Sequence, residues 1–189
     1  MAGFSFEVRL SSDVPFVRIL KSPMSVECRA SPETLSLVHE TAEDAALIEA
    51  LLDRAFGPGR FAKSSERVRE FANFAPEMSF CAWMDGKLAG VVRMWRVNVG
   101  ETPVVFLGPL AVEPGLQSTG VGGKLVGQAC AAAEAAGEAA VLLVGDPPYF
   151  QRFGFVNAPA AIMPGPVDQR RVLMLPFRDV TLSGDVRPR

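Results

Sequence analysis

One stretch of this chain carries its strongest structural signal, and it reads Val104-Val-Phe-Leu-Gly-Pro-Leu-Ala-Val-Glu-Pro-Gly-Leu-Gln-Ser-Thr-Gly-Val-Gly-Gly-Lys124. Its first part, Val104–Val112, is apolar and partly β-branched, which predicts a buried strand. A turn signal, Glu113-Pro-Gly115, follows, and then an alanine-rich helical pattern begins. Such a strand, turn and helix start direct backbone N–H groups at an anion, because the first amides of a helix have no partners within it.

The loop between strand and helix fits one of three phosphate-binding patterns. A P-loop ends in Gly-Lys-Ser/Thr, but Lys124 is followed by Leu125. A dinucleotide-binding fingerprint needs a third glycine where Leu125 stands. The third pattern, Gln/Arg-x-x-Gly-x-Gly/Ala, has Gln117, Gly120 and Gly122 at its fixed positions. Both glycines lack a Cβ, so a phosphate can approach the main chain closely.

A second block supports the third pattern. A short apolar strand, Val141–Val144, precedes Gly145-Asp-Pro-Pro-Tyr-Phe-Gln-Arg-Phe-Gly-Phe155. Together with Leu107-Gly-Pro-Leu-Ala-Val112 and the glycine loop, this block resembles the YhbS-like branch of the GNAT superfamily, a group of predicted bacterial N-acetyltransferases. The resemblance covers roughly Leu37 to Phe155.

The resemblance implies an α/β (α+β) fold of the GNAT acyl-CoA N-acyltransferase type, with a mixed central sheet, a splayed pair of parallel strands and flanking helices. It implies an enzyme that moves an acetyl group from acetyl-CoA to a primary amine, on a small molecule, a protein N-terminus or a lysine, by direct attack on the thioester. The alternative is a non-catalytic acyl-CoA-binding regulatory domain. The internal Gly108-Pro109 agrees with a bulged strand, because proline cannot donate a ladder hydrogen bond.

The resemblance also assigns the cofactor site. Main chain around Leu110 to Val112 would pair with the pantetheine arm, and the loop from Gln117 to Lys124 would hold the pyrophosphate. The expected cofactor-binding residues are Leu110, Ala111, Val112, Gln117, Ser118, Thr119, Gly120, Val121, Gly122, Gly123, Lys124, Asp146, Tyr149 and Phe150.

The proton donor for the leaving thiolate is the least regular part of the pattern. Many family members place a tyrosine four residues before the Gly-Phe glycine, but Phe150 stands there, and Tyr149, the only tyrosine, comes one residue earlier. One residue on a helix is about 100° of rotation. We expect Tyr149 to act as the catalytic acid; the alternative is a ring that only packs. Asp146 is the best placed acid, and its alternative is to cap the helix before Pro147. The base could also be water or an acid from the first helices.

Composition narrows the function classes. The chain has 189 residues, 49% of them hydrophobic, and a net charge of −2, which argues against an electrostatic nucleic-acid binder. It has no long apolar run and no signal-peptide pattern at its start, so we expect a cytoplasmic protein away from membranes. Cys28, Cys81 and Cys130 form no CxxC pair and are expected to be free thiols. His39 is the only histidine, and no metal is expected.

We divide the chain into three parts. Residues 1–34 are predicted to be an N-terminal extension, either an extra hairpin at a homodimer contact or a loose arm, and residues 1–24 to be dispensable for the cofactor site. Residues 35–182 form the predicted acetyltransferase domain, and residues 183–189 a loose tail. The helices expected within 41–57 and 64–73 border the acceptor groove in the resembled family. Their basic residues are expected to form an ordinary solvated face: Arg54, Arg60, Lys63 and Arg67.

Overall fold

The computed structural model describes residues 34–62 and 64–189, and the predictions for residues 1–33 lie outside them. A mixed sheet with the strand order β1-β3-β4-β5-β6-β9-β7 forms the centre. Its strands are β1 Leu35–His39, β2 Asn73–Phe74, β3 Phe80–Met84, β4 Lys87–Val99, β5 Thr102–Val112, β6 Ala140–Val144, β7 Val156–Asn157, β8 Ala161–Ile162, β9 Val172–Pro176 and β10 Gly184–Pro188. The α-helices are α1 Ala45–Phe56, α2 Ser64–Phe71, α3 Val121–Ala135 and α4 Pro147–Phe150.

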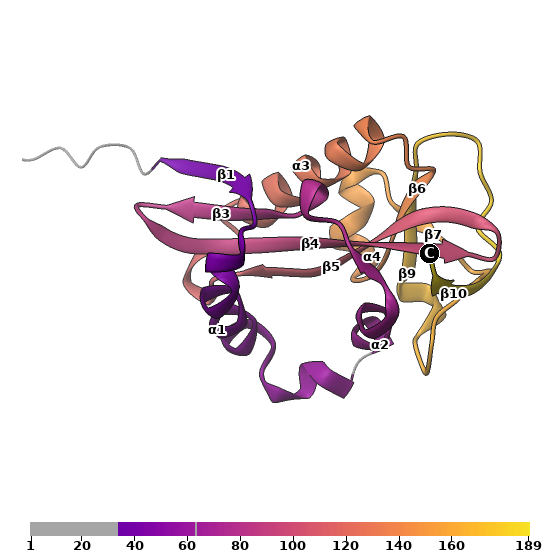
Figure 1. Ribbon diagram of the computed structural model, residues 1–189, viewed down its shortest axis with the longest axis horizontal. Helices are drawn as coiled ribbons and strands as arrows, with labels where there is room; N and C mark the ends of the chain where they lie inside the picture. The colour runs from indigo at the N-terminus through magenta and orange to yellow at the C-terminus, as the bar shows by residue number, and fades with distance from the viewer. Residues whose placement is uncertain (1–33, 63) are drawn as a thin grey trace, which may run out of the picture. The chain divides into compact units, whose positions relative to one another are not determined.

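Helices cover both faces of this sheet (Figure 1). On one face, α1 buries Ile48, Leu51 and Leu52 against a small cluster that includes Val91 of β4 and Ala111 of β5. On the other face, α3 packs on β3, β4 and β5. Its buried residues recur at helical spacing and are Val121, Leu125, Val126, Ala129, Cys130 and Ala133. The two layers enclose β4 and β5, and the end of β5 contributes to the candidate site.

Local sequence signals account for several boundaries. Asp85 and Gly86, which join β3 to β4, have φ of +50° and +74°, as a two-residue hairpin turn requires. Thr41 and Asp44 form a capping box just before α1. Helix α2 ends at Phe71 rather than Asn73, because Asn73–Phe74 leaves the helix to pair with β4 as β2.

A bulge in β5 reverses which of its side chains face α3. Met94 of β4 lies opposite Leu107, and Val92 lies opposite Leu110, so β5 has an extra residue between these pairs. The extra length falls at Gly108-Pro109, whose peptide bond is cis, and the indole N–H of Trp95 donates to the Gly108 carbonyl at 2.6 Å. Before the bulge, Val105 and Leu107 belong to the core under α3; after it, Leu110 and Val112 pack there.

The predicted splayed parallel pair is confirmed. Strands β5 and β6 are paired only at Val105 with Val141 and Phe106 with Leu142. Beyond these pairs β5 follows β4 as far as Val112, while β6 ends at Val144. The edge of β5 that faces β6 is therefore left without a strand partner from the bulge onward, among the described residues.

The prediction of a loose tail at residues 183–189 is wrong, because Gly184–Pro188 forms β10. This strand pairs antiparallel with the end of β4, Val186 lying opposite Val99, and parallel with β8. Strand β4 is 13 residues long and outreaches β3, so β2 and β10 complete the same edge. Val186 is 5% exposed, and Arg189 forms an ion pair with the buried Glu138. The C-terminal residues are thus part of the core structure.

Candidate functional site

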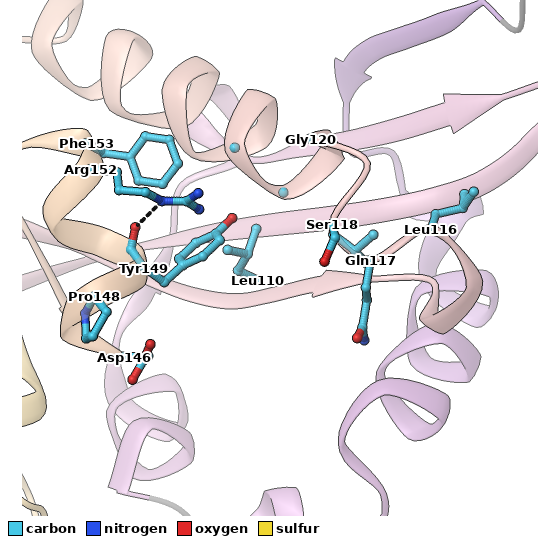
Figure 2. A pocket seen from close by; sticks show the side chains of 13 residues that line it. Leu110, Leu116, Gln117, Ser118, Gly120, Asp146, Pro148, Tyr149, Arg152 and Phe153 are labelled. Carbon is cyan, nitrogen blue, oxygen red and sulfur yellow. Dashed lines mark hydrogen bonds between the residues drawn. The ribbon is translucent and has the colours of Figure 1, made fainter.

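A cavity of about 820 Å³ lies where the end of β5, the glycine loop and α4 meet (Figure 2). Tyr149 and Arg152 enter it from the α4 side, and Gln117 and Ser118 come from the loop opposite them. We call it the donor cavity. Its lining residues are Leu110, Val112, Leu116, Gln117, Ser118, Gly120, Gly122, Gly123, Asp146, Pro148, Tyr149, Arg152 and Phe153.

The glycine loop presents the positive end of α3 to this cavity. Gly120 is the N-cap residue with φ of +93°, a conformation that favours glycine, and no side chain caps the helix. Lys124 donates its N–H to the Gly120 carbonyl at 3.1 Å, so the helical ladder starts one turn into the helix. Gly120, Gly122 and Gly123, which precede it, line the cavity, and the first amides of a helix are a common place for phosphate to bind.

Nine of the fourteen predicted cofactor residues line the donor cavity, and the side chains of the other five do not. Ala111 and Val121 are 3% and 2% exposed and belong to the core. The Thr119 hydroxyl donates back to the Leu116 carbonyl at 2.6 Å. The side chain of Lys124 is exposed on α3, and Phe150 lies in the core. The role of the main chain at these five positions stays a prediction.

Four lining residues were not predicted: Leu116, Pro148, Arg152 and Phe153. The Arg152 guanidinium lies 4.6 Å from the centre of the Tyr149 ring, and its Nε donates to the Tyr149 carbonyl at 3.2 Å. A signal for Arg152 was present, because a cation three residues after a tyrosine shares its helical face. Arg152 lies in the segment Gly145–Phe155, but the family resemblance assigned it no role.

Tyr149 is partly buried within a group of aromatic rings. Its ring centre lies 4.9 Å from that of Phe150 and 5.6 Å from that of Phe153. Burial raises the pKa of the phenol, and the positive charge of Arg152 opposes this effect only in part. Among the described residues, no side chain or carbonyl accepts a hydrogen bond from the hydroxyl. The phenol therefore keeps its proton at neutral pH and has it available for a ligand.

Asp146 follows β6 directly and does not cap α4 with its side chain. The N–H groups of Tyr149 and Phe150 both donate to its backbone carbonyl at 3.1 Å, whereas its carboxylate makes no capping bond. Within the described ranges that carboxylate has neither a hydrogen bond nor an ion pair. The capping alternative is therefore wrong, and the carboxylate is exposed to a ligand.

A second cavity, of about 840 Å³, adjoins the donor cavity, and we call it the acceptor cavity. Four residues line both cavities: Leu110, Gln117, Asp146 and Tyr149. The remaining walls come from α1, the 3-10 helix Pro58–Ala62, α2, the bulge of β5, the end of β6, α4 and the segment before β9. They include Leu52, Phe56, Arg60, Arg69, Gly108, Phe150, Asp168 and Arg171. The splay of β5 from β6 thus opens into two connected spaces.

The expected solvated basic face is wrong for Arg60. Its side chain is 9% exposed, and its guanidinium pairs with Glu49 at 2.6 Å and Asp53 at 3.2 Å, both on α1. Arg54 is half exposed and pairs with Glu113 at 2.8 Å, and Arg67 is exposed, as predicted. Lys63 lies outside the described residues.

Within the described residues, no group of histidine, cysteine and carboxylate side chains is arranged to hold a metal ion. No helix there is long and apolar enough to cross a membrane.

Comparison with known proteins gives concordant results. The sequence profile of the "Acetyltransferase (GNAT) family" matches residues 45–155. The uncharacterized N-acetyltransferase YjhQ of Escherichia coli (strain K12) is 30% identical over 156 residues, which cover 76% of this chain and 86% of YjhQ. A GNAT family acetyltransferase from Brucella melitensis, solved in complex with acetyl-CoA, is 26% identical with a TM-score of 0.64, over 82% of this chain and 96% of that one. The E. coli N-acetyltransferase YhbS, solved with CoA, is 27% identical with a TM-score of 0.69, over 82% and 90%.

Proposed function

Because the chain belongs to the GNAT acetyltransferase family and is an acetyl-CoA-dependent acyltransferase, we propose that it acetylates a primary amine by direct attack of that amine on the thioester. The observation that carries this proposal is the junction of the two cavities at Leu110, Asp146 and Tyr149. A thioester entering from the donor cavity and an amine entering from the acceptor cavity would meet there. Holding two reactants in one geometry is a large part of catalysis for such a transfer.

The donor cavity suits acetyl-CoA in charge and in backbone geometry. The amides at the start of α3 would bind the pyrophosphate, since Gly120, Gly122 and Gly123 line the cavity. The edge of β5 from Leu110 to Val112 lacks a strand partner toward β6 and would pair with the amides of the pantetheine arm. One N–H of this segment would also donate to the thioester oxygen as negative charge develops on it.

The side chains at the junction supply the proton transfers. Asp146 would accept a proton from the ammonium form of the acceptor, directly or through one water. The amine lone pair then attacks the carbonyl carbon, the C–N bond forms and the C–S bond breaks. The Tyr149 hydroxyl would protonate the leaving thiolate, and the second proton, lost by the acylated nitrogen, would restore the phenol through water. The products are the N-acetylated amine and CoA, and Asp146 returns its proton to solvent. Burial, which raises the pKa of this phenol, keeps the proton in place until the thiolate forms.

The experiment that tests the proposal is turnover of acetyl-CoA over a panel of amines, with release of free thiol as the readout. We expect thiol release that depends on the amine, and loss of at least about tenfold in kcat/KM for Asp146→Asn. The non-catalytic alternative predicts that acetyl-CoA binds while no amine releases thiol above the rate of hydrolysis. That outcome would overturn the proposed function.

We also propose that the protein works in the cytoplasm. Cys81 and Cys130 are both unpaired and buried, as is usual for proteins of a reducing compartment. Labelling of the protein in fractionated cells tests this placement.

A further inference from the structure

The acceptor cavity contains guanidinium groups that acetyl transfer does not use. Arg60, Arg69 and Arg171 line it, together with the carboxylates of Asp146 and Asp168. Asp168 is already engaged, because its two oxygens accept from Nε and a terminal nitrogen of Arg170 at 3.0 and 2.8 Å. Arg60 is engaged by two carboxylates of α1. The open question is what Arg69 and Arg171 bind.

Arg69 holds a positive charge inside the wall of the cavity. It comes from α2, its side chain is 12% exposed, and among the residues the structure describes it forms an ion pair only with Glu66. A Cβ added to Gly108, at the bulge of β5, would lie 3.8 Å from one of its terminal nitrogens. Burial lowers the pKa of this guanidinium, and the positive charges of Arg60 and Arg93 lower it further. The ion pair with Glu66 raises the pKa and offsets these effects only in part. A further anion at this point would be bound favourably.

Arg171 lies beside the end of β6. Its Nε donates to the carbonyl of Gly145, just beyond β6, at 3.2 Å, which fixes the base of the guanidinium. In the part of the chain that the structure describes, its two terminal nitrogens donate to no acceptor. A fork of this kind matches the oxygen spacing of a carboxylate or a phosphate. Arg69 lies near the bulge of β5 and Arg171 lies near the end of β6. The two arginines therefore line the same cavity, one beside each of the splayed strands.

Charge is therefore divided within the acceptor cavity. The carboxylate of Asp146, at the junction with the donor cavity, attracts an ammonium group, whereas the two arginines attract an anion. No ion pair joins Asp146 to either arginine within the described ranges, so both kinds of charge are available to one ligand. We infer, on the basis of the proposed function, that the acceptor is a primary amine that also carries an anionic oxygen group, a carboxylate or a phosphate, bound by Arg171 and Arg69.

The inference is tested by ligand binding, which does not depend on turnover. The probes are reaction products, measured by calorimetry on protein saturated with CoA: the N-acetyl derivatives of glycine, alanine, leucine and phenylalanine against their carboxamides, and N-acetylglucosamine 6-phosphate against N-acetylglucosamine. We expect an anionic probe to bind at least about tenfold more tightly than its neutral partner. A preference among the carboxylates or for the phosphate identifies which anion is used. Equal binding within every pair, or no binding by any probe, would overturn the inference.

Variants locate the anion. Arg171→Gln should remove most of the preference for the anionic probe, leaving only what Arg69 supplies, and Arg171→Lys, which keeps the charge but loses the fork, should retain more of it. Arg178→Gln is the matched control, because it removes the same charge beyond the opposite end of β9, where Pro176 pairs with Ala140. It should keep the full preference. A preference that is undiminished in Arg171→Gln, or that Arg178→Gln lowers equally, contradicts the assignment.

Turnover separates this inference from the proposed function. If neutral amines release thiol from acetyl-CoA as fast as their anionic counterparts, the acetyltransferase function stands and the inference fails. If the anionic products bind with the expected preference while no amine releases thiol, the binding site stands and the proposed function fails.

Discussion

The hydroxyl of Tyr149 lies directly over Gly122. A Cβ added to Gly122 would stand 2.8 Å from the hydroxyl oxygen and 3.4 Å from Cγ2 of Val112. The first of these separations is shorter than van der Waals contact allows, so the second glycine of the loop makes room for the phenol. Tyr149, one residue before the position expected in the family, thus reaches the donor cavity at the start of α3.

This relationship predicts a specific coupling between the two residues. Gly122→Ala should lower the free energy of unfolding by about 1–3 kcal/mol through overpacking, less whatever the better helix propensity of alanine returns. The loss should shrink when Tyr149→Phe removes the hydroxyl, which a double-mutant cycle in urea measures.

Gly127→Ala is the matched control for this cycle. A Cβ at Gly127 meets nothing within 4 Å and lies on the same helix, so this change should stabilise the protein by about 0.5–1 kcal/mol. Additive effects of Gly122→Ala and Tyr149→Phe would mean that the phenol does not occupy the place described.

Tyr149→Phe tests the catalytic role of the hydroxyl. The ring contacts with Phe150 and Phe153 survive the change, while the proton donor is lost. If the hydroxyl serves the leaving thiolate, kcat should fall by at least about tenfold with the affinity for acetyl-CoA little changed. Weaker cofactor binding at normal turnover would instead identify a binding contact, and no change in either quantity would leave the ring as packing.

The phosphate-binding loop is tested at Gly120 with two substitutions. Gly120 has φ of +93°, so both Gly120→Ala and Gly120→Glu strain the backbone, but only glutamate brings a negative charge and bulk to the mouth of the loop. Calorimetry should show affinity for acetyl-CoA lost in Gly120→Glu and largely kept in Gly120→Ala. Circular dichroism checks that both variants are folded. Equal affinities in the two variants would show that this loop does not bind the pyrophosphate.

The two described thiols should be unreactive in the folded protein. Burial raises the pKa of Cys81 and of Cys130 from 9.0 to about 12. At pH 8 neither thiol should be alkylated by iodoacetamide until the protein is denatured, which peptide mass spectrometry distinguishes residue by residue. Because the folded-state pKa values are raised, their contribution to stability is complete below pH 9 and is lost between pH 9 and about pH 12. Rapid labelling of Cys81 in native protein would contradict the buried position.

Deletion of residues 184–189 should destabilise the protein. It removes β10 from the end of β4, exposes the apolar surface around Val99, and leaves the Glu138 carboxylate, 6% exposed, without Arg189. We expect a loss of at least about 2 kcal/mol in urea unfolding, because an uncompensated buried charge is costly. Arg187→Gln, on the same strand but in an exposed pair with Glu101, should change stability by about 0.5 kcal/mol or less. Unchanged stability after the deletion would instead support the prediction of a loose tail at residues 183–189.

The elements that the sequence predicted well are those whose signals are local. The strand–glycine loop–helix unit around Gly120 depends on a few neighbouring residues with special backbone preferences. The bulge at Gly108-Pro109 belongs with them, since proline cannot take part in a regular ladder. These signals, with the resemblance they support, were enough to predict the family, the fold and most of the donor cavity.

The remaining features depended on partners that are distant in the chain. The strand Gly184–Pro188 has a polar sequence without a strand pattern. It forms a strand because it pairs with the end of β4, where Asn98 and Pro188 are 90 residues apart in the chain. Arg60 is buried because Glu49 and Asp53 of α1 face it. The approach of Tyr149 to Gly122, and the division of charge between Asp146 and Arg171, exist only once β5 and β6 have splayed. By itself the sequence determined the local backbone and the chemical class of the protein; the shape and charge of the acceptor cavity depended on the tertiary structure, because side chains from separate elements form it and no short-range pattern encodes their meeting.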